Sequence, residues 1–72
     1  MSDPIDAVKA LGLQLVAEDQ AAGEGREECD WTWAGLLFQA MSADINPQNG
    51  VEADALVAAI RKVYQEAWRA AR

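Results

Sequence analysis

Hydrophobic residues recur at helical spacing in three stretches of the chain, separated by two segments rich in glycine, asparagine and charge. In the first stretch they fall on one side of a helix, with a period near 3.6 residues: Ile5, Val8, Leu11, Leu15 and Val16. Asp3 is a favourable N-cap, and Pro4 suits the first helical position because its missing N–H needs no partner there. Gly23 is typical of the residue just after a helix. The pattern predicts a helix over residues 3–22.

The middle stretch predicts a second helix over residues 31–45, with Asp30 as its cap. Its apolar residues cover more than half of the helix circumference: Trp31, Trp33, Ala34, Leu36, Leu37, Phe38, Ala40, Met41 and Ile45. A helix that is apolar over most of its surface is buried on several sides. The alternation of tryptophan with polar residues also permits a strand over residues 29–38, although a lone strand has no partner in this chain.

The third stretch predicts the longest helix, over residues 50–71. Apolar residues spaced three and four apart give it a coiled-coil-like seam: Ala53, Leu56, Ile60, Val63, Ala67 and Ala70, with Val57, Tyr64, Trp68 and Ala71 on one flank. The cap is either Asn46, before Pro47, or Asn49, which has Glu52 three residues later.

These elements predict one all-α domain over residues 1–72, a small three-helix bundle or helical hairpin with a long C-terminal helix. Cys29 is the only cysteine and there is no histidine, so neither an internal disulfide nor a usual zinc site can brace the fold. A chain of 72 residues can build only a small core. We therefore expect oligomerisation, as a homodimer or a larger assembly, to complete the bundle.

Charge is unevenly distributed along the chain, whose net charge is −6. Residues 1–30 carry eight acidic and two basic side chains, whereas residues 61–72 carry four basic side chains and one acidic side chain. The acidic balance argues against direct binding of nucleic acid. It favours either head-to-tail self-association or a basic protein partner. No apolar run is long enough to cross a membrane, and the first residues do not resemble a signal peptide, so we expect a cytoplasmic protein.

The sequence offers no recognisable catalytic chemistry. Without histidine, neither Cys29 nor a serine has the usual general base. Asp44–Gly50 resembles the start of an EF-hand loop, but its glycine is at the seventh position and Ala55 stands where a bidentate glutamate belongs. We expect this segment to be a turn, and the protein to be a non-enzyme without a cofactor or metal.

The leading functional hypothesis is a protein–protein interaction module that inhibits or adapts a larger protein by covering a basic site; the alanine-rich composition suggests a bacterial or phage protein. Tryptophan is enriched at interface hot spots, and three tryptophans are many for this length. The candidate interface residues are Trp31, Trp33, Leu36, Ala40, Leu13, Tyr64 and Trp68. The alternatives are a self-assembling structural protein, or a small-ligand binder whose pocket lies at an oligomer interface near Thr32 and Gln39.

Overall fold

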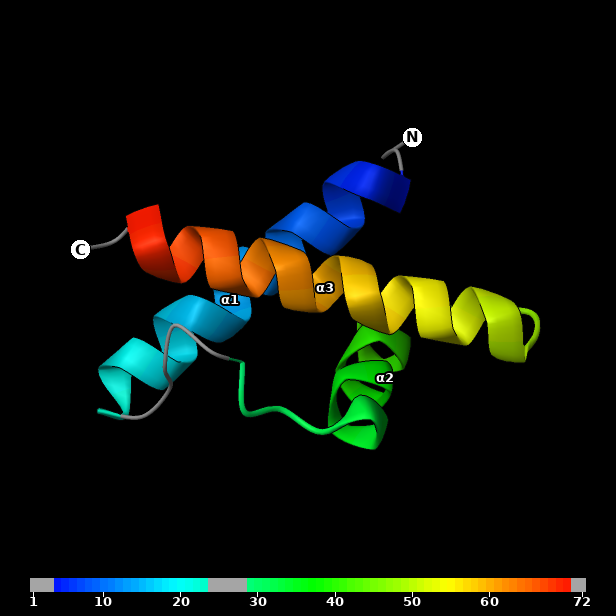
Figure 1. Ribbon diagram of the computed structural model, residues 1–72, viewed down its shortest axis with the longest axis horizontal. Helices are drawn as coiled ribbons and strands as arrows, with labels where there is room; N and C mark the ends of the chain where they lie inside the picture. Colours follow the sequence, from blue (N-terminus) through cyan, green and yellow to red (C-terminus); the bar gives the residue numbers. More distant parts are fainter. Residues whose placement is uncertain (1–3, 24–28, 71–72) are drawn as a thin grey trace.

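Three helices form the described part of the chain, residues 4–23 and 29–70 of a computed structural model (Figure 1). They are α1 (Pro4–Ala21), α2 (Trp33–Ser42) and α3 (Gly50–Ala70). These residues contain no strand, which confirms the all-helical prediction and shows that the strand alternative for residues 29–38 was wrong. In Figure 1, α3 crosses α1 near the middle of both helices, and the shorter α2 lies against α3 beside this crossing.

The end of α1 agrees with the prediction from Gly23. This glycine has a φ of 72°, in the left-handed region that glycine adopts without a steric penalty. Its N–H donates to the carbonyl of Gln20 at 3.1 Å, and the N–H of Ala22 donates to the carbonyl of Glu18 at 3.0 Å. The predicted cap at Asp3 lies outside the described residues.

Helix α2 is shorter at both ends than predicted. Its cap is Thr32, not Asp30: the Thr32 hydroxyl accepts a hydrogen bond from the Gly35 N–H at 2.9 Å, so Trp31 precedes the helix. At the other end the Ile45 N–H donates to the Ala40 carbonyl, and the Asp44 N–H to the Met41 carbonyl, at 2.9 and 3.1 Å. With Asp44 at φ 63°, these bonds form a Schellman motif. Periodicity alone included Ile45, which instead folds back onto the core after this turn.

Helix α3 begins with a reciprocal cap, and Asn49 rather than Asn46 supplies it. The Asn49 side-chain oxygen accepts from the Glu52 N–H at 2.9 Å, while a Glu52 carboxylate oxygen accepts from the Gln48 N–H at 2.8 Å. Two N–H groups that the helix cannot satisfy internally are thus paired. Val51 follows the cap and is 80% exposed.

The core lies where the three helices meet. Its buried hydrophobic residues are Leu11, Leu15 and Val16 of α1, Leu36 and Ala40 of α2, and Ala53, Val57, Ile60 and Tyr64 of α3. The buried stripe of α3 is therefore displaced from the predicted seam towards its Val57 and Tyr64 flank, and Ala70 is exposed. The displacement follows from the crossing geometry, because α1 passes over α3 instead of running along it (Figure 1).

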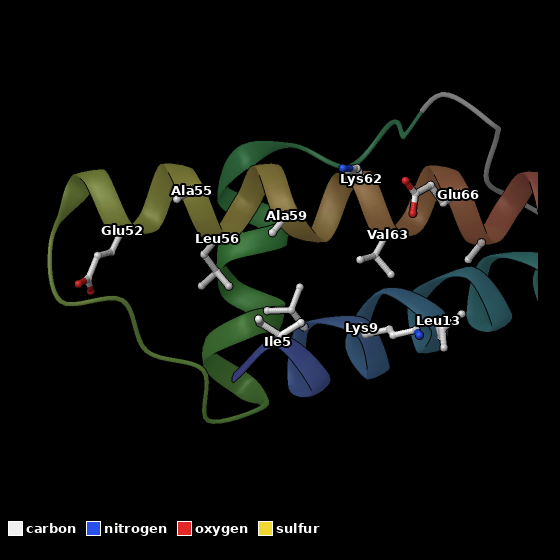
Figure 2. Close-up of a pocket in the computed structure, with 12 residues that line it drawn as sticks. Ile5, Lys9, Leu13, Glu52, Ala55, Leu56, Ala59, Lys62, Val63 and Glu66 are labelled. Atoms are coloured by element: carbon white, nitrogen blue, oxygen red, sulfur yellow. The ribbon is translucent and has the colours of Figure 1, made fainter. Parts of the chain in front are cut away.

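Gly12 lies where α1 packs closely against Val63 of α3. A Cβ atom added to this buried glycine would lie 2.5 Å from Val63 Cγ1 and 2.9 Å from Val63 Cβ. The absence of a side chain at Gly12 thus sets the distance between the helices. On the N-terminal side of this crossing α1 and α3 diverge, as Figure 2 shows, and leave an open space between them.

A group of hydrogen bonds holds the segment before α2 against the two long helices. The Asp19 carboxylate on α1 accepts hydrogen bonds from the Tyr64 hydroxyl at 2.6 Å and from Trp31 Nε1 at 3.0 Å. Arg61 on α3 donates to the Trp31 carbonyl at 3.1 Å. Trp31 is therefore fixed to both long helices, and the Tyr64 ring stacks on Trp68 with centroids 6.3 Å apart.

Candidate interaction surfaces

Four of the seven predicted interface residues do not offer a ready contact surface. Leu36, Ala40 and Tyr64 have no exposed surface in this chain, because they build its core. Trp31 is half-buried, and its indole N–H already donates to Asp19. Sequence periodicity could not separate the core face of α2 from its outer face, because both are apolar.

The remaining three predicted residues lie at the surface in different places. Trp33 on α2 is 45% exposed, and Leu13 on α1 is 49% exposed. Trp68 is half-buried against Tyr64 near the end of α3. The structure therefore does not bring the predicted residues together into one site. Apart from Val51, the large exposed apolar side chains of the described residues lie on two surfaces.

The first surface is the α2 strip, which we define as Trp33, Phe38 and Met41. Their positions lie within about 140° of arc on an ideal helix: Phe38 and Met41 face away from the buried Leu36, and Trp33 lies at the edge of the strip nearest the core. The exposed fractions of Phe38 and Met41 are 68% and 51%. Trp33 Nε1 donates to the Asp54 carboxylate at 2.8 Å, which places a carboxylate at the edge of the strip. Sequence reasoning overlooked Phe38 and Met41 because it gave priority to tryptophan.

The stretch of sequence that contains the α2 strip, residues 29–60, carries only acidic charged side chains. No lysine or arginine occurs between Cys29 and Ile60. This stretch contains four acidic residues, all of them exposed: Asp30, Asp44, Glu52 and Asp54. The α2 strip is thus an apolar surface within an acidic segment.

The second surface is a groove of about 770 Å³ between the diverging halves of α1 and α3 (Figure 2). We call it the α1/α3 groove. Its apolar lining residues are Ile5, Val8 and Leu13 of α1 and Ala55, Leu56, Ala59, Val63 and Ala67 of α3. Ile5 was expected on the core side of its helix, but it is 74% exposed because α1 has already diverged from α3 at this position.

Four charged side chains line the α1/α3 groove, and their charges balance. Lys9 comes from α1, and Glu52, Lys62 and Glu66 come from α3. The groove is therefore electrically different from the acidic α2 segment. It also lies away from Thr32 and Gln39, where a ligand pocket was predicted from the sequence.

Among residues 4–23 and 29–70, no group of three acidic or cysteine side chains is arranged to hold a metal ion. No helix within those ranges has both the length and the apolar character needed to span a bilayer.

Comparison with known proteins reveals no relative of this chain. No protein-family model matches the chain, and no curated protein or solved structure shows significant similarity to it.

Proposed function

We propose that this protein is a non-enzymatic interaction module that uses the α2 strip to bind a basic surface of another protein. The observation that supports the proposal is the exposure of three large apolar side chains on one short helix. Aromatic residues and methionine are enriched in protein interfaces, where their burial supplies much of the binding energy. Covering a basic site on a larger protein would make the module an inhibitor or an adaptor.

The charge of the surrounding segment favours a basic partner over a neutral or acidic one. The exposed carboxylates of Asp44, Glu52 and Asp54 would repel an acidic surface and attract a basic one. This attraction acts mainly on the association rate and weakens as salt is added. The apolar contacts of Phe38 and Met41 depend little on salt. Binding should therefore have a salt-dependent part and an apolar part, which can be measured separately.

The proposal is tested with two designed helical peptides that share one pattern of leucines. The first peptide carries lysine at every polar position and the second carries glutamate. We expect the lysine peptide to bind, with a change in tryptophan fluorescence because Trp33 lies in the strip, and the glutamate peptide not to bind. Equal binding of both peptides, or binding of neither, would contradict the proposal.

A pair of matched variants separates the strip from general electrostatic attraction. Phe38→Ser removes a large exposed apolar side chain inside the α2 strip, whereas Val51→Ser removes one outside it. Neither substitution changes the net charge or opens the core. We expect Phe38→Ser to weaken lysine-peptide binding by about tenfold, about 1.4 kcal/mol, and Val51→Ser to leave it unchanged. Equal binding by both variants would show that charge alone attracts the peptide.

We also propose that the chain associates with itself. The core described here contains nine buried hydrophobic residues, while Ile5, Leu13 and the α2 strip leave large apolar side chains in water. A fold of this size has little stability to spare, and burial of apolar surface between copies would add to it. Sedimentation of the purified protein tests this: the mass should rise with concentration, and a constant monomer mass would contradict it.

A further inference from the structure

The α1/α3 groove has the shape of a site for a helix. Its lining on α3 runs from Glu52 to Ala67, which at 1.5 Å per residue corresponds to a length of about 22 Å. Figure 2 shows Leu56, Ala59 and Val63 along the middle of the α3 side, Glu52 and Glu66 towards its two ends, and Lys9 between Ile5 and Leu13 on α1. Ala55 and Ala59 make one wall from small side chains, so a helix could approach the α3 backbone closely. An added helix would give the layered arrangement of a four-helix bundle.

The charges of the groove indicate which kind of helix would fit. A strongly basic or strongly acidic helix gains little from a rim that carries two lysines and two glutamates. The matching helix should itself carry both signs beside an apolar stripe. The first half of α1 meets this description, since Asp6 and Lys9 are exposed on the same two turns as Ile5.

We propose that the occupant is α1 of a second copy, so that two chains pair symmetrically through their α1/α3 grooves. This proposal rests on the self-association proposed above and assigns it a surface. In a two-fold interface each contact occurs twice, with the roles of the two copies exchanged. Ile5 and Leu13, which stand exposed on the α1 side of the groove, enter the partner's groove while the partner's Ile5 and Leu13 enter this one.

The electrostatics of such a pairing are self-complementary. Lys9 of one copy can approach Glu52 or Glu66 of the other, and Asp6 can approach Lys62, because the α3 side of the rim carries both signs. Asp44 and Asp54, the other exposed carboxylates near the α2 strip, do not line the groove and take no part in this pairing. The net charge of −6 on each chain opposes association in general, so a balanced surface is the one through which two copies can meet.

Two alanine substitutions on neighbouring residues of α3 test the assignment. Ala59 lines the groove, whereas the adjacent Ala58 is also exposed but does not line it. Ala59→Glu and Ala58→Glu add the same side chain and the same charge to the same helix. Sedimentation equilibrium gives the dissociation constant of each variant, and circular dichroism verifies that each remains helical.

We expect the wild-type chain and Ala58→Glu to associate with similar dissociation constants. The dissociation constant of Ala59→Glu should be higher by about tenfold or more, because its new charge would be buried in an apolar interface. If all three chains associate equally, or if both variants are weakened equally, the groove is not the interface, although self-association stands. If the wild-type chain is a monomer at every concentration, both this inference and the self-association proposal fail. If the groove binds a long-chain alkyl sulfate while the chain is a monomer, its occupant is an amphiphile and not a second copy.

Discussion

Replacing Gly12 by alanine tests the close crossing of α1 and α3. In an exposed helix interior this substitution stabilises by about 1 kcal/mol, because glycine loses more backbone freedom on folding than alanine does. At Gly12 the new methyl group would lie 2.5 Å from Val63 Cγ1, about 0.9 Å short of the 3.4 Å at which ordinary van der Waals contact begins. Two effects of opposite sign therefore compete at one position.

The steric effect should win at Gly12. A different Val63 rotamer could move Cγ1, but Val63 Cβ would still lie 2.9 Å from the new methyl group and cannot rotate away from it. The helices would have to separate, and overpacking of this kind costs about 2–3 kcal/mol, in the upper part of the usual range. The gain in helix propensity offsets about 1 kcal/mol of this cost, so we expect the free energy of unfolding to fall by about 1–2 kcal/mol in total.

Urea denaturation followed by circular dichroism, at one low protein concentration, measures this loss. Gly50→Ala is the matched control, since a Cβ at this exposed first position of α3 meets nothing within 4 Å and should stabilise by about 0.5 kcal/mol. In a Val63→Ala background, which removes the Cγ1 contact, Gly12→Ala should cost about 1 kcal/mol less than in the wild type. A Gly12→Ala protein more stable than the wild type would refute the close crossing.

Three further substitutions test other parts of the account. Asp19→Ala removes the acceptor of the Tyr64 and Trp31 hydrogen bonds, so the free energy of unfolding, measured by thermal denaturation, should fall by about 2 kcal/mol. A change within error of zero would mean that these hydrogen bonds do not stabilise the fold. Thr32→Ala removes the α2 cap and should cost about 1 kcal/mol in the same assay, whereas Asp30→Ala, at the position first predicted as the cap, should cost less. Trp33→Ala should weaken binding of the lysine peptide more than it lowers the free energy of unfolding, because this side chain is 45% exposed; the reverse order would place Trp33 in the core.

The helices could be predicted from the sequence because their signals are local. The period of the apolar residues, the αL glycine at Gly23 and the reciprocal cap of Asn49 and Glu52 all act within a few residues. The ends of α2 were predicted less well. At these ends a threonine competes with a neighbouring aspartate as the cap, and Asp44 adopts a left-handed conformation that periodicity does not reveal.

The two surfaces could not be located from the sequence, because they depend on the angle at which helices cross. Leu36 and Phe38 are equally apolar, yet one is fully buried and the other is 68% exposed. Gly12 gave no sign in the sequence that it would sit against Val63, and the divergence of α1 from α3 beyond that contact is what opens the groove. The sequence did indicate that a middle helix this apolar would leave some apolar side chains exposed, and the exposure of the α2 strip agrees with this.

The most direct test of the proposed function is a nuclear magnetic resonance titration of the isotope-labelled chain with the lysine peptide. The Trp33 indole N–H, which donates to Asp54 at the edge of the α2 strip, gives a signal that reports on this surface alone. We predict that this signal and the backbone amides of Phe38 and Met41 shift during the titration, while the amides of Ile5 and Ala59 in the α1/α3 groove do not. Shifts confined to the groove, or no shifts at all, would contradict the proposal that the α2 strip is the binding surface.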